Sequence, residues 1–422
     1  MPSTTSPRGR AAAMPFILVT VLIDMISIGL IVPVLPILVG TFTTDPTAQT
    51  WWYGVVTGVF ALANFFGSPV LGALSDAYGR RRVLLLGFCG LATSFFVTGL
   101  ATALWMIIAV RAFSGAMQSN AAVANAYVAD ITPPQDRARR FGLLGAMFGI
   151  GFILGPALGG FLGSIHLHLP FFVAGTLSLI NLAYGCFVLP ESLPPERRQP
   201  FQWRKVHPLA TFSRLVKLET VRPLILVAGL ATLAQFALHT CWVLYTHFRF
   251  GWGPREVGYS LFTVGLVSAI VQGVLLRHLL KHFSTRTLAV GGLAASCLTY
   301  LAFGLATQGW EMYLAIVIGG LVGGGAQAAI TSVISGAVKA SEQGSTMGSI
   351  SSLNSLAAVI APLIATPLLA TVSHLPRDAF WLGLPFFFCA ALQGVSAWVA
   401  HRYFAQHPQA GAPAAAATQT AP

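Results

Sequence analysis

Residues 191–220 read ESLPPERRQPFQWRKVHPLATFSRLVKLET, the only long polar stretch in a chain of 422 residues. Its proline and charge content indicates a cytoplasmic linker. Six apolar segments lie on each side of it, and each is long enough to cross a bilayer, which takes about 20 residues. The twelve segments fall near residues 14–41, 51–75, 83–102, 104–129, 140–164, 170–190, 223–248, 257–280, 287–306, 310–338, 344–371 and 379–403.

The composition also predicts a membrane protein. Charged residues make up only 9% of the chain and hydrophobic residues 55%, with a mean hydropathy of +0.74. A soluble chain is about one quarter charged, and no soluble core would bury this much apolar surface. Soluble nucleotide-binding enzymes and secreted disulfide scaffolds are therefore excluded. The five cysteines lie in apolar segments too far apart for a metal motif, so no metal is expected.

The net charge of +12 is distributed in a way that predicts topology. Of the 24 Lys and Arg residues, Arg249, Arg255 and Arg377 lie in loops on one side, and Arg111 lies within a span. The others lie in the N-terminus, the alternate loops and the end of the last span. This positive-inside pattern predicts that both termini are cytoplasmic. It gives no indication of a nucleic-acid surface.

The two halves of the chain repeat each other. Four pairs of landmark residues recur in the same order at offsets of 204 to 206, namely Gly54 and Gly258, Gly87 and Gly291, Trp105 and Trp310, and Pro156 and Pro362. Duplicated halves of six helices are typical of alternating-access transporters. The predicted fold is all-α, with two pseudo-symmetric six-helix bundles. The predicted parts are an N-terminal tail (1–13), a first bundle (14–190), the linker (191–222), a second bundle (223–404) and a disordered cytoplasmic tail (405–422).

Asp24 is the one acid of the twelve placed deep within a span, in LVTVLIDMISIGLIVPVLP (18–36). A charged side chain there costs about 2.5–3.5 kcal/mol on insertion scales, so such residues are functional sites by default. The alternative is a protonated carboxyl group that only hydrogen-bonds a neighbouring helix.

Arg111 is the only deep base. At 1.5 Å per residue it lies about 12 Å from one face of the membrane and Asp24 about 15 Å from the other, which gives similar depths in a core about 30 Å thick. We hypothesise direct contact, in which Arg111 favours the ionised acid while burial opposes it, leaving a titratable group. Arg111 could instead bind helix carbonyls. The equivalent positions of the second half are Ala228 and Ile316, so proton handling is expected in the first half.

Two spans are rich in glycine. The fifth, FGLLGAMFGIGFILGPALGGFLG (141–163), has glycines at every fourth position from 151 to 163, which let helices pack closely. Its GxxxGPxxGG pattern comprises Gly151, Gly155, Pro156, Gly159 and Gly160. The tenth contains GGLVGGGAQAAI (319–330), which lacks the strand and lysine of a phosphate loop and predicts helix packing.

The loop after the second span reads GALSDAYGRRR (72–82). The arginines alone would serve as an orientation signal. The frame of Gly72, Asp76 and Gly79 around Arg80 and Arg81 favours a conformational latch instead.

Polar residues within the spans predict a polar cavity for substrate. Interhelical hydrogen bonding explains any single one, but together they exceed what packing requires. They are Asn64, Gln118, Asn120, Asn125, Gln235, His239, Gln272, Gln327 and Asn354. His239 could titrate or could only join two helices.

The chain resembles the major facilitator superfamily, specifically its drug:proton antiporters of the tetracycline-efflux group. The resemblance covers essentially the whole chain and is strongest over residues 15–165. The motifs that carry it are GALSDAYGRRR (72–82), RAFSGAMQSNAA (111–122) and GIGFILGPALGG (149–160), with LIDMISIGLIVPVLP (22–36) and ATALWMIIAVRAFSGA (101–116) especially close.

This resemblance implies roles for individual residues. Asp24 would be the membrane-embedded acid of the first span and Arg111 the arginine linked to proton transfer. Asp76, Arg80, Arg81 and Asp130 would form a charge cluster latching the outward-facing state. Asp76 would also face the positive end of the eleventh span.

Four departures from the resembled group bear on the substrate. Tetracycline exporters are expected to carry Asp, His and Asp where Ser94, Ser268 and Ala295 stand here, and Gln where Asn64 stands. Three ionisable positions are thus absent, which argues against a metal–tetracycline chelate as substrate.

These observations predict a proton-coupled efflux pump for small amphiphilic compounds. We expect a functional monomer in the bacterial inner membrane, with protons, substrate and lipid as partners, no cofactor, no nucleic acid and no enzymatic activity. The same fold could instead take up a metabolite or sugar, although the fifth-span motif argues against uptake. A membrane enzyme would have only His166 and His168 as a candidate centre, and a receptor would require larger soluble regions.

Overall fold

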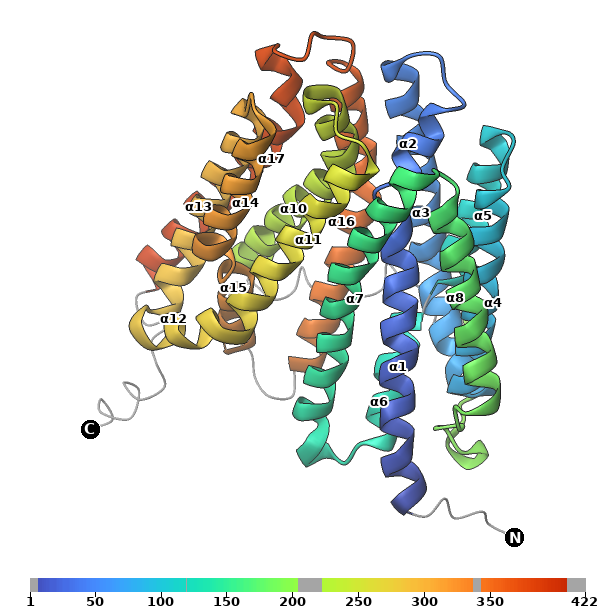
Figure 1. The fold of residues 1–422 in the computed structure, drawn as a ribbon. Coiled ribbons are helices and arrows are strands. Elements are labelled where there is room, and N and C mark those ends of the chain that lie inside the picture. The colour runs from blue at the N-terminus through green and yellow to red at the C-terminus, as the bar shows by residue number, and fades with distance from the viewer. Residues whose placement is uncertain (1–6, 119, 204–221, 337–342, 408–422) are drawn as a thin grey trace, which may run out of the picture. The chain divides into compact units, whose positions relative to one another are not determined.

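The computed structural model describes residues 7–118, 120–203, 222–336 and 343–407, which form helices and contain no β-strand (Figure 1). Most of the predicted linker and nearly all of the predicted tail beyond residue 404 lie outside these residues. Within the described residues, eleven helical segments are long and apolar enough to cross a membrane. The fourth predicted span is divided into α5 (Leu104–Met117) and α6 (Asn120–Ile131). With it the twelve predicted spans are accounted for, so the all-α membrane fold is confirmed.

The chain divides into two compact units, each described here by itself. Unit 1 contains the described parts of Met1–Thr44, Val55–His207 and Gly253–Phe262. Unit 2 contains those of Asp45–Gly54, Pro208–Trp252 and Thr263–Pro422. Each unit thus includes the first turns of one helix that begins in the other half of the sequence.

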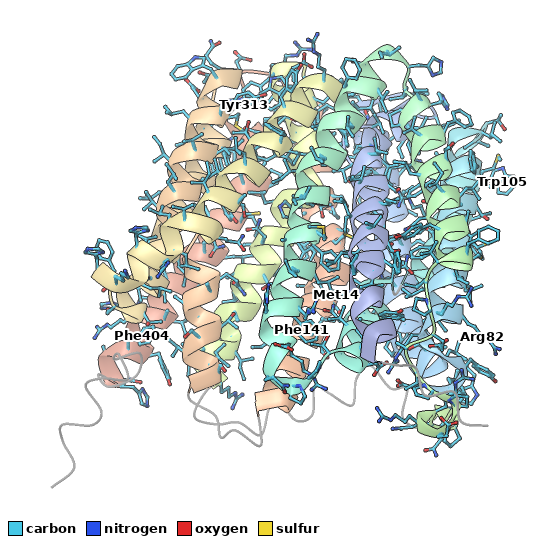
Figure 2. All side chains as sticks on the ribbon, turned by 60° about the horizontal axis from the view of Figure 1, so that its bottom comes forward. Met14, Arg82, Trp105, Phe141, Tyr313 and Phe404 are labelled. Carbon is cyan, nitrogen blue, oxygen red and sulfur yellow. The ribbon has the colours of Figure 1, made fainter. Side chains whose placement is uncertain are left out.

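Unit 1 is organised around its first helix, which runs beside α7 and α8 (Figure 1). Its helices are α1 (Pro7–Ile31), α2 (Leu35–Gly40), α3 (Pro46–Tyr78), α4 (Arg80–Gly99), α5, α6, α7 (Arg137–Ile165) and α8 (Leu169–Phe187), with short 3₁₀ turns at Pro134–Asp136 and Pro195–Arg197. Ile17 of α1, Phe88 of α4 and Tyr127 of α6 lie in its buried core. Figure 2 shows Arg82 and Trp105 at opposite ends of this unit.

Unit 2 holds most of the second half. Its helices are α10 (Arg222–Phe250), the second part of α11 (Pro254–Ile270), a π-helical turn (Val271–Leu275), α12 (Leu276–His282), α13 (Thr285–Leu305), α14 (Gly309–Gly323), α15 (Ala326–Gly336), α16 (Gln343–Ala370), a 3₁₀ turn (Phe380–Gly383) and α17 (Leu384–Gln406). Val227 of α10, Ile330 of α15 and Phe404 of α17 lie in its core. Tyr313 and Phe404 lie at opposite ends of the unit in Figure 2.

Two spans predicted to be continuous are broken at equivalent places. The fourth span is interrupted between Met117 and Asn120, where Gln118 has an extended backbone. The tenth turns at Gly324 and Gly325, between α14 and α15. The two breaks are 206 residues apart in sequence, the offset that also relates Pro156 to Pro362. Each break places the first residue of a helix inside a span, an arrangement that transporters use for binding sites.

The first span also differs from its predicted continuous run over 14–41. Helix α1 ends at Ile31, a turn follows, and α2 begins at Leu35. Pro33 and Pro36 lie at this junction. Because proline lacks a backbone N–H and clashes with the preceding turn, two prolines three residues apart favour a break of the helix here.

Candidate proton site and cytoplasmic charge cluster

Asp24 is buried in unit 1 and bonded to an amide. Its side chain lies on α1 and is 3% exposed. Asn120 Nδ2 donates a hydrogen bond of 3.0 Å to Asp24 Oδ1. Thr20 lies one turn before it, and Phe88 and Phe148 contribute apolar walls to the same small pocket. Among the described residues, Asn120 is the one polar side chain bonded to this carboxyl group to offset its loss of water.

The break in the fourth span and one glycine bring Asn120 into this pocket. Asn120 is the first residue of α6 and is 5% exposed. Gly87 of α4 faces it so closely that a Cβ there would collide with Asn120 Oδ1. The sequence marked Asn120 only as one of many polar span residues, because its pairing with Asp24 depends on a break that hydropathy does not indicate.

Arg111 does not pair with Asp24. Its guanidinium lies over the ring of Phe60, 5.4 Å from the ring centroid, and the side chain is 9% exposed. The ion pairs present among the described residues do not include Asp24, so the predicted direct contact is wrong. Arg111 precedes the break and faces α3, whereas Asp24 faces α6 beyond it. A depth estimate fixes height in the membrane but not direction around a helix.

The second half has lost this polar pair at the equivalent place. Ala228 replaces Asp24 and Ala326 replaces Asn120, and both alanines belong to the apolar core of unit 2. Gly292 is equivalent in position to Gly87, since a Cβ at Gly292 would lie 2.7 Å from the Cβ of Ala326. The same helix crossing is therefore polar in one half and apolar in the other.

The glycines of the fifth span pack α7 directly against α1. A Cβ at Gly155 would lie 2.7 Å from the Cα of Gly29, and one at Gly159 would collide with the backbone of Leu30. Gly151 meets Met25 in the same way. Because Met25 follows Asp24, this ridge fixes the position of the carboxyl group.

The remaining two residues of the pattern face another helix. A Cβ at Gly160 would lie 2.8 Å from the Cα of Gly258 in the first turns of α11. A Cβ at Gly258 would in turn lie 2.8 Å from the carbonyl oxygen of Pro156. In unit 2, Gly54 of α3 lies against Thr366 of α16. Gly54 precedes Gly258 by 204 residues, and Thr366 follows Gly160 by 206. The two close crossings are thus related by the sequence repeat.

Arg80 is the centre of the cluster at the α3–α4 loop. Its guanidinium forms ion pairs with Asp76 at 2.6 Å and with Asp130 at 3.1 Å. It also donates to the hydroxyl of Ser75 at 2.6 Å. Arg81 donates to the carbonyls of Gly185 and Cys186 at the end of α8, where the helix dipole favours a positive charge.

Glu191 is part of this cluster, although the sequence placed it only among the loop acids. Its Oε1 accepts hydrogen bonds from four backbone N–H groups, those of Arg80 (2.8 Å), Arg81 (3.5 Å), Ser192 (3.1 Å) and Leu193 (3.1 Å). It therefore supplies the negative charge at the start of α4. No local pattern could have identified it, since 111 residues separate it from Arg80.

Two glycines of this loop differ in what they do. Gly79 has a φ of 106°, in the left-handed region that favours glycine, and a Cβ there would collide with the Glu191 carboxylate. A Cβ at Gly72 would meet nothing within 4 Å. The predicted frame therefore needs Gly79, and the packing in this structure does not explain Gly72.

The predicted cavity residues belong to both units. Gln235 and His239 are joined by a hydrogen bond in unit 2, and Thr232 donates to Asn354 on α16 at 3.3 Å. Asn125 and Gln272 bond within their own helices. The others are spread over both units, with Asn64 and Gln118 half-buried in unit 1 and Gln327 exposed in unit 2.

Replacing Gly87 with Ala is expected to impair coupling by displacing Asn120 from Asp24. Its methyl group would occupy the space of Asn120 Oδ1. We expect transport driven by a pH gradient to fall at least tenfold, since about 1.4 kcal/mol of misplacement suffices for that factor. The matched control is Gly291→Ala, because a Cβ at this neighbour of Gly292 meets nothing within 4 Å. Equal transport by the two variants would argue against the role of Asn120.

A repeated bundle of spanning helices, with broken spans at equivalent positions and a buried acid in one repeat, defines a membrane transporter of the alternating-access class. The model of the Major Facilitator Superfamily matches residues 17–362 and, in an overlapping second match, residues 249–421. The chain belongs to that superfamily, as its motifs predicted.

Relatives are similar over nearly the whole chain. The tetracycline resistance protein, class C, of Escherichia coli is 37% identical over 381 residues, covering 90% of this chain and 94% of its own. The class D protein of Salmonella ordonez is 34% identical over 366 residues, with coverages of 86% and 91%. The nucleoside transporter NupG has a TM-score of 0.75 at 13% identity, covering 93% of this chain and 99% of its own, which confirms the fold alone.

Proposed function

We propose that this chain is a proton-coupled exporter of small amphiphilic compounds. The observation that carries the proposal is the buried carboxyl group of Asp24, bonded to Asn120 at a break in the fourth span. The names of the bacterial relatives, which are resistance proteins, support export over uptake of a metabolite or sugar.

The mechanism follows from the effect of protonation on a buried charge. Facing outward, Asp24 takes up a proton; facing inward, substrate binding favours its release to the cytoplasm. Protonation removes a buried charge and so changes which conformation is more stable, as coupling requires. One proton entering at 100 mV supplies about 2.3 kcal/mol, and each unit of pH gradient adds about 1.4 kcal/mol. Accumulation ratios of roughly ten to a few hundred follow.

Arg111 and the charge cluster would support this cycle without contacting the proton. Arg111, fixed against Phe60, places a positive charge in the same unit as Asp24. The contacts of Arg80 with Asp76 and Asp130 would stabilise one of the two transport conformations. We also propose that the protein acts as a monomer in the bacterial inner membrane with both termini cytoplasmic, and that it has no enzymatic activity.

A susceptibility and accumulation screen tests the function. Cells lacking their own pumps would express the wild type or Asp24→Asn and be exposed to a panel of amphiphilic dyes and antibiotics, tetracycline included. We expect the wild type to lower the accumulation of several amphiphiles. Wild-type cells that accumulate every compound as control cells do would contradict the proposal.

Replacing Glu191 with Gln is expected to slow export several-fold. The four N–H groups at the start of α4 would lose a charged acceptor, and hydrogen bonds to charged groups contribute about 1.5–3 kcal/mol. Glu196→Gln is the matched control, because Glu196 is an exposed acid of the same segment. Initial export rates at equal expression are compared. A Glu191→Gln rate equal to that of Glu196→Gln would remove Glu191 from the working cluster.

A further inference from the structure

A chain of four polar side chains crosses unit 2 from α17 to α10. The hydroxyl of Tyr300 on α13 donates to Gln235 Oε1 at 2.9 Å. Gln235 Nε2 lies 3.1 Å from His239 Nε2, one turn further along α10. Gln393 of α17 lies next to Tyr300 and is 4% exposed.

The direction of these bonds fixes the state of His239. An amide nitrogen can only donate, so His239 Nε2 accepts from Gln235 and the ring is neutral, with its proton on Nδ1. Because Tyr300 gives its hydrogen to Gln235, its oxygen is left as an acceptor for the neighbouring Gln393 amide. Both bonds of the chain therefore point towards His239.

Gln393 Oε1, at the far end, is buried and has no hydrogen-bond partner among the described residues. A buried acceptor without a partner is uncommon and calls for an explanation.

Reversal of the chain would give this oxygen a donor, the hydroxyl of Tyr300. When His239 Nε2 carries a proton, it needs an acceptor, which Gln235 provides by turning its amide group over. Gln235 Nε2 then donates to the oxygen of Tyr300, and Tyr300 turns its hydrogen towards Gln393, whose amide also turns to present Oε1. Amide groups and hydroxyl rotors can make these changes without moving the backbone. In both directions each bond of the chain joins one donor to one acceptor.

The surroundings of His239 favour water over lipid. His239 and Gln235 lie near the middle of a 29-residue helix and both are exposed, on a face that continues to the bonded pair Thr232 and Asn354. Polar side chains in a span face a protein interior or a water-filled cavity. Water can therefore deliver the proton.

Few titratable groups surround His239, and those at its level are neutral near pH 7. From the helices packed around it they are Tyr300 and Cys297 of α13, Cys389 of α17 and Cys241 of α10 itself. The described parts of α15, α16 and the Phe380–Gly383 turn contribute none. The remaining titratable groups of these helices lie towards their ends, at Arg222, Tyr245, His247, Arg249, Arg286, His401, Arg402 and Tyr403.

We propose that His239 is a second proton-binding site of this transporter, whose charged form is stabilised by reversal of the Gln235–Tyr300–Gln393 chain. The proton passes from water at the exposed face of α10 to Nε2, and no other reactant is required. The role in transport rests on the proposed proton coupling, but the titration of His239 can be measured without transport.

Nitrogen-15 NMR of histidine-labelled protein tests this proposal. The signal of His239 is assigned by its absence in His239→Gln. We expect the neutral Nδ1–H form at high pH and a doubly protonated ring at low pH. Gln393→Leu removes the final acceptor of the reversed chain and should lower the midpoint by about one pH unit. Gln393→Glu supplies a stronger acceptor and should raise it.

Gln272→Leu is the control, because Gln272 bonds only to Ser268 on its own helix among the described residues. The second site would be overturned if neutral His239 carries its proton on Nε2, or if His239 does not titrate. A midpoint that stays the same in both Gln393 variants as in the wild type would also overturn it. None of these results would affect the proposed function, which fails on the Asp24→Asn test instead.

Discussion

Asp24→Asn is expected to abolish concentrative export while leaving the protein folded in the membrane. An asparagine oxygen can still accept the hydrogen bond from Asn120, so the packing of α1 against α6 is preserved. The side chain can no longer exchange a proton, and the about 2.3 kcal/mol available per proton at 100 mV is lost. Inside-out vesicles loaded by a proton gradient with a fluorescent amphiphile from the initial screen provide the measurement.

The variant needs two comparisons. Asp378→Asn, which changes an acid outside the helices, should export as the wild type does. A protonophore should reduce wild-type export to the level of Asp24→Asn. Export by Asp24→Asn that still responds to the protonophore would refute the role of Asp24.

Arg249→Ala is expected to cause the largest loss of stability. Arg249 is 5% exposed, and its guanidinium donates to three backbone carbonyls, those of Ala306 (2.9 Å), Arg377 (2.8 Å) and Ala379 (2.7 Å). It thereby joins the end of α10 to two loops of unit 2. Removing it leaves three carbonyls without their charged donor, for a cost of about 3 kcal/mol or more.

Thermal unfolding of purified protein measures this loss, with Arg255→Ala as the control. Arg255 is exposed and contacts Tyr259 of its own helix. We expect a clear drop in the unfolding midpoint for Arg249→Ala and little change for Arg255→Ala. Equal midpoints for the two variants would show that these carbonyl bonds contribute little.

The sequence predicted the spans because hydropathy is a local property. It also predicted the close packing of the fifth span, since glycines four residues apart form a ridge on any helix. The breaks in the fourth and tenth spans were not predicted. GAMQSNA and LVGGGAQ are apolar enough to read as continuous helix, and only tertiary packing shows where each helix ends.

The proton site was predicted in part. Asp24 stood out because it is the one deep acid, but its partner could not be chosen without knowing how each helix is rotated. Asn120, Gly87 and Glu191 owe their roles to residues 33 to 111 positions away. Arg249 was grouped with the loop arginines, although it is buried, because its acceptors are backbone carbonyls that no sequence pattern reveals.

The most direct test of the account is infrared difference spectroscopy of purified protein across a pH titration, comparing the wild type with Asp24→Asn. The account predicts a protonated carboxyl band in the wild type that disappears as pH rises, reappears on return to low pH, and is missing from Asp24→Asn. A band of the same size in both proteins, or a wild-type band that does not respond to pH, would contradict it.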